Sequence, residues 1–577
     1  MQTVKGISVS RGISIAPLFQ FRNTPLTHER RRIENPLTEW ERYQQAVQTS
    51  LTRLEQIYHQ AVAEVGTDEA GIFHAHISIL QDPDLNDGVK DRIYSEKINA
   101  ETALYEVSEE YCRTLEEIND EYIRARTTDL RDVRDGVLRI LLNVNDQTVK
   151  LKTPAIVVAR DLTPSECLLL DRRVVRGFCT VEGGTTSHTA ILSRSLGIPA
   201  MVGIPARLLD LPTGTPAILD GYEGKLILEP DTETIHTYEA MQHKRRQFLD
   251  AAFREAHRPA VTKDGCSVEV VANIANDNLQ DIKEAVQNGA EGVGLLRTEF
   301  IYLDCETLPD EDVQYEKYKT ILQSFGNKPV ILRTLDIGGD KQLPYLELPY
   351  ELNPFLGVRG LRLCLRNLPL FKAQIRAALR AASYGNLYLM FPMVTKAAEI
   401  HAAKAVISEC RAELVAEGYS VPLRIPIGIM IEIPAAALMA RHLAREVDFF
   451  SIGTNDLTQY TLAVDRTNSV LTDLANGFDP AVLTLIQSVI EGAHRNGKKV
   501  GICGELGGDP LAIPLLVGMG MDELSMNPSE IPAAKQIIRQ LSQKEAHAVA
   551  RQALELETPQ DVVALVKSAF PFIENYL

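Results

Sequence analysis

His188 lies in a segment whose residue types suit chemistry on a phosphoryl group. The segment 183–199 opens with two glycines, which allow a tight turn, and continues with Thr186 and Ser187, which favour a helix N-terminus. The run from Thr189 to Leu196 predicts a short amphipathic helix that ends at a Gly-Ile-Pro sequence. Amides at a helix start carry partial positive charge and stabilise an attached anion. We therefore predict that His188 carries a phosphoryl group, although a lone histidine is more often structural.

A second group of polar residues lies far along the chain, at or just after short apolar runs. Its arginines can bind phosphate and carboxylate groups bidentately, and its carboxylates are hard oxygen ligands of the kind Mg²⁺ prefers. The expected substrate is a small phosphorylated carboxylic acid, with Mg²⁺ as cofactor. The arginines are Arg297, Arg333, Arg359 and Arg466, the metal ligands are Glu432 and Asp456, and Asn455 and Cys503 lie beside them.

Two other cofactor chemistries are disfavoured by the sequence. No pair of histidines accompanies the carboxylates, which argues against zinc. No Gly-x-x-x-x-Gly-Lys-Ser/Thr loop is present, so a nucleotide phosphoryl donor is not indicated.

The polar group can be positioned by a parallel barrel. Eight short apolar runs alternate with helical stretches, which predicts a (β/α)₈ barrel, and active sites of such barrels lie at the C-terminal ends of the strands. The expected strands are Val268 to Ala275, Val293 to Arg297, Val330 to Asp336, Leu387 to Val394, Ile427 to Ile433, Phe449 to Gly453, Val500 to Gly504 and Glu523 to Met526.

The rest of the chain predicts an α/β domain, a helical subdomain and a helical linker. The region from Thr38 to about Asn143 is rich in helix formers, with Leu51, Leu54, Ile57 and Ala61 on one apolar stripe. Strand signals return at Ala155 to Ala159 and continue to Leu228. We expect a multidomain α/β protein: an α/β domain at 1–30 and 146–230, an inserted all-α subdomain at 31–145, a helical linker at 231–259 and the barrel at 260–577.

Composition limits the class of protein. The chain has 577 residues and a net charge of −17, which opposes binding to nucleic acid. Its eight cysteines form no Cys-x-x-Cys pair, so we expect reduced thiols. No apolar run has transmembrane length and the first residues do not resemble a signal peptide, so we expect a cytoplasmic protein without membrane insertion.

At this point the sequence resembles enzyme I of the bacterial phosphoenolpyruvate:sugar phosphotransferase system. The resemblance runs along the whole chain. It is carried by the motifs Gly71-Ile72-Phe73-His74-Ala75-His76, Asp161-Leu162-Thr163-Pro164-Ser165-Glu166, Asp336-Ile337-Gly338-Gly339-Asp340-Lys341, Asn353-Pro354-Phe355-Leu356-Gly357 and Cys503-Gly504-Glu505-Leu506, together with the segments around His188, 291–300 and 448–466.

The resemblance implies an activity and its partners. Mg²⁺-bound phosphoenolpyruvate in the barrel would phosphorylate His188 in a swivelling α/β domain, and the phosphoryl group would pass to the carrier protein HPr, docked on the helical subdomain. Arg297, Arg333, Arg359, Arg466 and Asn455 would bind the substrate, and Cys503 would protonate the enolate to give pyruvate. The family also implies a homodimer through the barrel.

Two positions depart from the family pattern, and other functions stay open. Thr185 replaces an arginine of the usual GGRTSH motif, and Cys167 replaces the last threonine of DLTPSET. They are consistent with a specialised paralogue that serves a different HPr-like carrier. A phosphoenolpyruvate synthase or pyruvate,phosphate dikinase would need a nucleotide-binding domain, for which 38–143 is too short and too helical. A regulatory module without catalysis would lack catalytic residues, and none is missing.

Overall fold

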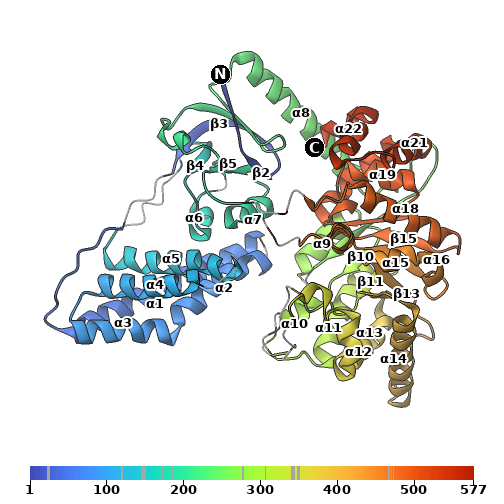
Figure 1. Cartoon of the computed structure of the whole chain (residues 1–577), viewed down its shortest axis with the longest axis horizontal. Helices are drawn as coiled ribbons and strands as arrows, with labels where there is room; N and C mark the ends of the chain where they lie inside the picture. The colour runs from blue at the N-terminus through green and yellow to red at the C-terminus, as the bar shows by residue number, and fades with distance from the viewer. Residues whose placement is uncertain are drawn as a thin grey trace. The chain divides into compact units, whose positions relative to one another are not determined.

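The chain forms two compact units, Met1–Gln242 and His243–Leu577, whose elements are labelled in Figure 1. This computed structural model describes all residues except positions 22–25, 66, 118–120, 145–150, 152, 172, 185–186, 276–277, 304, 306, 340–342, 344, 347, 349–350, 466–467, 469–470, 472–473 and 577. Side chains at 60, 62–65, 67–70, 117, 121–126, 168–169, 188 and 195 are likewise not described. Thr185, Thr186, Arg466 and the His188 side chain therefore lie outside the description.

The first unit contains a mixed sheet of eight described strands, in the order β1-β8-β7-β3-β4-β5-β6-β2. Its central strands β3, β4, β5 and β6 are parallel neighbours, whereas the outer pairs are antiparallel. The strands are β1 Gln2–Lys5, β2 Ile7–Ser10, β3 Ile13–Gln20, β4 Ala155–Ala159, β5 Val175–Thr180, β6 Ala200–Val202, β7 Pro216–Asp220 and β8 Lys225–Leu228.

Both faces of this sheet are buried. Val157 and Phe178 point into one apolar core, and Ile156 and Cys179 point into the other. This explains why β4 is apolar throughout instead of alternating. The core that contains Val157 also includes residues of α6 and α7, which therefore cover that face, whereas η1 covers the opposite face. These helices are α6 Pro164–Leu169, α7 His188–Ser195 and η1 Ala206–Asp210.

A helical subdomain is inserted between two adjacent strands of the sheet. The chain leaves the sheet at Gln20 and returns at Ala155, and β3 and β4 pair in parallel. Leu51, Leu54 and Ala61 of the expected stripe are buried, while Ile57 is partly exposed. The helices are α1 Pro36–Val65, α2 Thr67–Gln81, α3 Pro83–Glu96, α4 Ala100–Glu117 and α5 Glu121–Leu141, which lie together in Figure 1.

The second unit contains a closed barrel of eight described strands, all paired in parallel. The barrel confirms the fold expected from the alternating apolar and helical runs. Several expected strands extend too far, because the polar residues after them belong to loops at the strand ends. The strands are β9 Glu269–Ile274, β10 Val293–Leu296, β11 Pro329–Arg333, β12 Asn386–Phe391, β13 Ile427–Ile431, β14 Phe449–Ile452, β15 Lys499–Ile502 and β16 Glu523–Met526.

Helices follow the barrel strands and bury their apolar faces against them in one continuous core. They are α9 Leu279–Gln287, α10 Glu299–Leu303, α11 Glu311–Phe325, α12 Leu361–Arg366, α13 Leu368–Ala381, α14 Ala397–Ala416, α15 Pro434–Leu438, α16 Ala440–Leu443, α17 Thr454–Leu462, α18 Pro480–His494, α19 Ala512–Met519, α20 Ile531–Gln540, α21 Gln543–Ala553 and α22 Pro559–Ala569. Short 3₁₀ turns include η2 Pro354–Leu356, η3 Ala382–Tyr384, η5 Glu505–Gly507, η6 Pro528–Glu530 and η7 Pro571–Asn575.

Helix α8, Thr232–Arg254, contributes to both units. In the first unit, Gln242 donates a hydrogen bond to the Ile13 carbonyl oxygen at 2.7 Å. In the second, the Phe248 ring lies 5.3 Å from that of Tyr576, centroid to centroid. The eight cysteines, all of them described, are free thiols, as expected from their spacing.

Candidate active site

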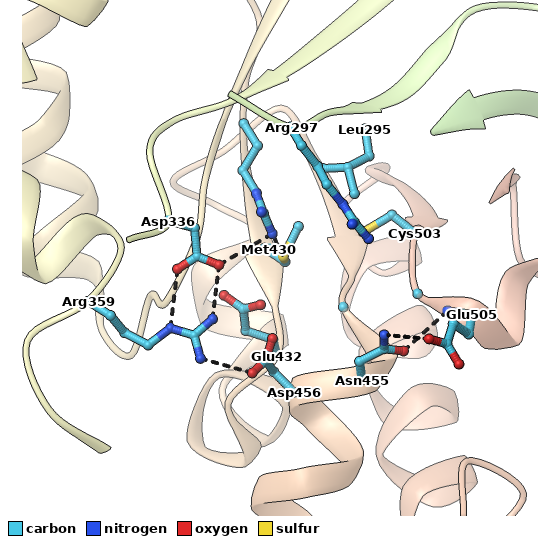
Figure 2. A pocket seen from close by; sticks show the side chains of 13 residues that line it. Leu295, Arg297, Asp336, Arg359, Met430, Glu432, Asn455, Asp456, Cys503 and Glu505 are labelled. Carbon is cyan, nitrogen blue, oxygen red and sulfur yellow. Dashed lines mark hydrogen bonds and ion pairs between the residues drawn. The ribbon is translucent and has the colours of Figure 1, made fainter. Parts of the chain in front are cut away.

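A polar cavity of about 270 Å³ opens at the C-terminal ends of the barrel strands. Figure 2 shows its lining side chains converging from separate strands. The lining residues are Leu295, Arg297, Arg333, Asp336, Arg359, Met430, Glu432, Gly453, Asn455, Asp456, Cys503, Gly504 and Glu505. Every described barrel residue that the sequence analysis selected is among them.

Strand ends account for this convergence. Arg333 is the last residue of β11, Arg297 and Glu432 follow β10 and β13 directly, and Asn455 and Asp456 lie in the first turn of α17 after β14. In a closed parallel barrel all strand C-termini meet at one end, so residues as distant in the sequence as Arg297 and Cys503 line one cavity.

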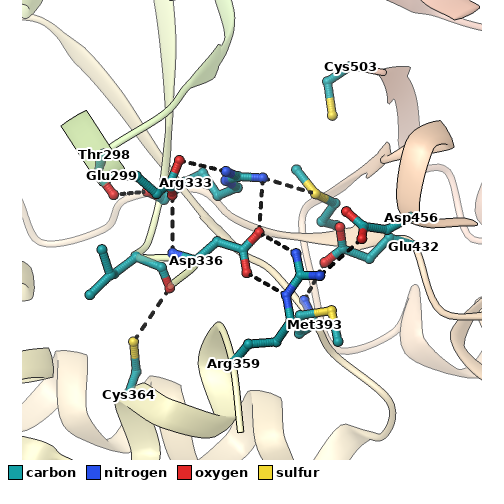
Figure 3. A network of polar contacts seen from close by, with 12 residues as sticks. Thr298, Glu299, Arg333, Asp336, Arg359, Cys364, Met393, Glu432, Asp456 and Cys503 are labelled. Carbon is teal, nitrogen blue, oxygen red and sulfur yellow. Dashed lines mark hydrogen bonds and ion pairs between the residues drawn. The ribbon is translucent and has the colours of Figure 1, made fainter. Parts of the chain in front are cut away.

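A buried ion-pair network holds two of the arginines (Figure 3). Arg359 donates from Nε and Nη2 to the two carboxylate oxygens of Asp336, at 3.2 and 2.9 Å. Its Nη1 donates to Asp456 Oδ1 at 3.0 Å. Arg333 donates from Nη2 to Glu299 Oε2 at 2.8 Å, and its Nη1 lies 3.4 Å from Asp336 Oδ2. Paired carboxylates fix the guanidinium planes and offset the cost of burying these charges.

Among the side chains that line the cavity, two buried polar atoms, one a donor and one an acceptor, have no hydrogen-bond partner among the described residues. They are the donor Arg333 Nε and the acceptor Glu432 Oε2. A buried unpaired polar atom is costly and calls for a ligand. The donor suits an anion and the acceptor suits a cation.

Glu432 and Asp456 fit a Mg²⁺ ion. The Met393 amide donates to Glu432 Oε1, which leaves Oε2 without a partner in the described part of the chain. Burial and the nearby Asp456 and Asp336 carboxylates raise the pKa of Glu432 to about 8, and a divalent cation would relieve that repulsion. The described residues contain no cluster of three or more His, Cys, Asp or Glu ligands. Mg²⁺ commonly uses one or two carboxylates and completes its shell with water and substrate oxygens.

Cys503 lies on the wall of the same cavity and is buried. Its thiol donates to the Ile452 carbonyl oxygen at an Sγ to O distance of 3.6 Å. Burial raises the pKa of the thiol to about 11. The group is therefore protonated near neutral pH and can donate a proton.

Asn455 is held in place by Glu505. The Asn455 side chain donates to Glu505 Oε1 at 3.5 Å and accepts from the Glu505 amide at 3.2 Å. Its amide plane is thereby fixed at the edge of the cavity, as Figure 2 shows.

His188 is the first residue of α7, as expected from the sequence. Ser187 is the N-cap, and its Oγ accepts a hydrogen bond from the Ala190 amide at 3.3 Å. Gly197, just after the helix, has φ of +63°, which glycine adopts without strain. The helix start predicted to carry the phosphoryl group is therefore present.

Sequence reasoning missed the carboxylates that orient the arginines. Asp336 and Glu299 were not selected, although Asp336 opens one of the motifs that carried the family resemblance. Glu299 accepts from Arg333 and from the Asp336 amide, at 2.8 and 3.1 Å. Strand-end position could have indicated both residues, but their role depends on partners that only the fold brings close.

Three family models cover most of the chain. The PEP-binding domain of PEP-utilising enzymes matches residues 250–543, the N-terminal domain matches 5–126 and the mobile domain matches 151–224. The chain is thus one of the PEP-utilising enzymes, that is, enzymes that use phosphoenolpyruvate.

Full-length relatives define the family within this class. A phosphoenolpyruvate-protein phosphotransferase of Bacillus subtilis (strain 168) is 44% identical over 571 residues, 99% of this chain and 100% of that protein. One of Geobacillus stearothermophilus is 44% identical over 570 residues, 99% and 98% of the two chains. One of Listeria monocytogenes is 43% identical over 571 residues, 98% of each. The chain belongs to the phosphoenolpyruvate-protein phosphotransferase family.

The helices of the structure give no indication of a membrane span. Among the described residues, no helix combines the length and apolar character needed to cross a bilayer.

Proposed function

We propose that the chain takes the phosphoryl group of phosphoenolpyruvate onto His188, releases pyruvate, and passes the group to a histidine of HPr or an HPr-like carrier. This is the first step of sugar uptake by the phosphotransferase system. The observation that carries the proposal is the pair of unpartnered buried atoms described above, Arg333 Nε and Glu432 Oε2, in side chains that line one cavity. A phosphorylated carboxylate with its metal ion supplies a partner for each.

The arginines bind and orient the substrate in this proposal. Arg297 and Arg333 face its phosphate and carboxylate groups, and Arg359 holds the metal-binding edge of the cavity through Asp456. Arg466 is assigned to substrate binding from the family resemblance. Asn455, fixed by Glu505, supplies a neutral hydrogen-bonding group beside them.

Glu432 and Asp456 would hold Mg²⁺, which neutralises charge on the substrate and polarises its oxygen atoms when bound. Glu432 is buried in the wall of the cavity, away from bulk water. A dry, preorganised site of this kind strengthens the electrostatic stabilisation of an enolate.

Cys503 would provide the proton that turns the enolate into pyruvate. Because burial raises the pKa of the thiol to about 11, Cys503 keeps its proton until a stronger base forms beside it. The enolate carbon, formed as the phosphoryl group departs, is such a base.

The phosphoryl group must then be delivered from the barrel to HPr. His188 would receive it at the start of α7, where the helix amides favour an anion. The α/β domain would swivel between the barrel and the helical subdomain at 31–145, which would dock HPr. We further propose a cytoplasmic homodimer assembled through the barrel.

Labelled phosphoenolpyruvate tests the central step. The wild-type chain with Mg²⁺ should acquire acid-labile label and transfer it to HPr. His188→Ala should acquire none while keeping the wild-type melting temperature. Undiminished label in His188→Ala would refute the assignment of His188.

A further inference from the structure

We infer that Ser451 is a positioning residue that hydrogen-bonds the Cys503 sulfur once the thiol has given up its proton. This inference rests on the proposed role of Cys503 as the proton donor. Ser451 lies in the segment 448–466 that carries part of the family resemblance, but it does not line the cavity and was not selected as a site residue.

Barrel register places Ser451 below Cys503. Ser451 of β14 pairs with Gly501 of β15, two positions before Gly453 and Cys503, which both line the cavity. Alternate residues of a strand share a face, so Ser451 points into the barrel one layer beneath the cavity. Gly501 has no side chain, and a Cβ there would lie 2.8 Å from Glu523 Oε1, so Glu523 borders the same layer.

The Ser451 hydroxyl is buried and makes no hydrogen bond of normal geometry in the described part of the chain. The residue is 1% exposed. The apolar side chains that pack with Cys503 in the barrel interior are Leu295, Ile331, Met390, Met430 and Phe449. A buried hydroxyl without a hydrogen-bond partner is costly, so we expect its partner to form during turnover.

The groups around the Cys503 thiol shift its pKa in opposite directions. Burial and Glu432 raise the pKa of Cys503, whereas Ser451, Arg333 and Arg297 lower it. Of the three that favour the thiolate, Ser451 has the largest effect. The two guanidiniums are assigned to the substrate in the proposed function, so the hydroxyl is the donor reserved for sulfur.

Proton balance follows from this arrangement. The S–H bond of Cys503 breaks, a C–H bond forms on the enolate carbon, and the electron pair stays on sulfur. Ser451 keeps its own proton and shares it with the thiolate as a hydrogen bond. Water reprotonates the sulfur before the next turnover.

The test compares three variants of the full-length chain with Mg²⁺ present. Ser451→Ala should lower kcat with phosphoenolpyruvate and HPr about tenfold, the scale of one hydrogen bond to a charged group, with KM for phosphoenolpyruvate changed less than about twofold. Ser451→Thr, which retains the hydroxyl, should restore most of the rate. Ser14→Ala removes another buried, unpartnered hydroxyl, in β3 of the first unit, and should leave kcat unchanged.

A chemical readout separates this role from packing. Alkylation of Cys503 by iodoacetamide at pH 9, followed on its peptide by mass spectrometry, reports the thiolate fraction. Ser451→Ala should slow it about tenfold, although the smaller side chain can only open access to the sulfur. Unchanged kcat and alkylation in Ser451→Ala would refute the inference, as would failure of Ser451→Thr to restore the rate.

Cys503→Ser separates the role of Cys503 from the role of Ser451. If Cys503→Ser keeps normal turnover, Cys503 is not the acid and the inference falls with it. If Cys503→Ser is inactive while Ser451→Ala is normal, the proposed function stands and only the role of Ser451 is wrong.

Discussion

The buried arginines of the cavity are held by carboxylates that lie beside them. Asp336 binds Arg359 bidentately and lies 3.4 Å from Arg333, so one carboxylate aligns two guanidiniums. Gly338, with φ of +118°, makes this possible, because a Cβ there would lie 2.5 Å from that of Arg359. The site is therefore organised before any ligand binds, which lowers the reorganisation needed during reaction.

Glu432→Ala should separate the two half-reactions. Transfer from phosphoenolpyruvate should fall by at least about a hundredfold, the scale on which a preorganised electrostatic group acts. Back-transfer from phosphorylated HPr to His188 should continue, because it needs no group in the barrel. Radiolabel assays in both directions measure the two steps. Equal loss in both directions would indicate misfolding instead of loss of a metal ligand.

Some residues of the site could be predicted from the sequence and others could not. Arg297, Arg333, Glu432 and Asp456 were predictable because polar residues at the ends of apolar parallel strands must meet at one end of a barrel. Ser451 was not, because it lies inside a strand and its position gains meaning only from its register with Gly501. Asp336 and Glu299 follow strands, but their partners Arg359 and Arg333 lie 23 and 34 positions away in the sequence, so their role is visible only in the fold.

The existence of the helices and strands could be predicted from the periodicity of apolar residues, whereas their exact bounds depend on hydrogen bonding. All eight expected barrel strands are present among the described residues. The expected run from Val330 to Asp336 nevertheless exceeds β11 by three residues, because Thr334, Leu335 and Asp336 form the loop that turns toward Arg359. Apolar character alone cannot separate a strand from the buried loop that follows it.

Glu523, at the start of β16, predicts a pH dependence of barrel stability. Burial and the neighbouring Glu269 raise its pKa from 4.5 to about 8. The folded state therefore binds more protons than the unfolded state between these values, and stability falls as pH rises through that range. Glu523→Gln, which mimics the protonated form, should raise the melting temperature above wild type at pH 8.5 and match it near pH 4.5. Thermal unfolding at several pH values measures the difference. A gain that is equal at both pH values would contradict this account.

At the scale of the whole molecule, His188 and the residues of the cavity belong to different units. His188 lies in Met1–Gln242, and Arg297, Glu432, Asp456 and Cys503 lie in His243–Leu577. Each unit has its own apolar core, the sheet and helical clusters in the first and the barrel cluster in the second. Separate cores favour independent folding.

Fragments cut within α8 should therefore divide the activity. The first fragment should end no earlier than Gln242, which bonds to Ile13, and the second should begin before Arg245, which donates to the Tyr576 carbonyl oxygen at 3.2 Å. Residues 1–242 should exchange phosphoryl groups with HPr but take none from phosphoenolpyruvate. Residues 243–577 should bind phosphoenolpyruvate, measured by calorimetry with Mg²⁺, without becoming phosphorylated. Proximity of reacting atoms within about 3 to 3.5 Å is required for direct transfer, so neither fragment alone can complete the reaction. Label passing from phosphoenolpyruvate to residues 1–242 alone would show that the barrel is not the obligatory donor site.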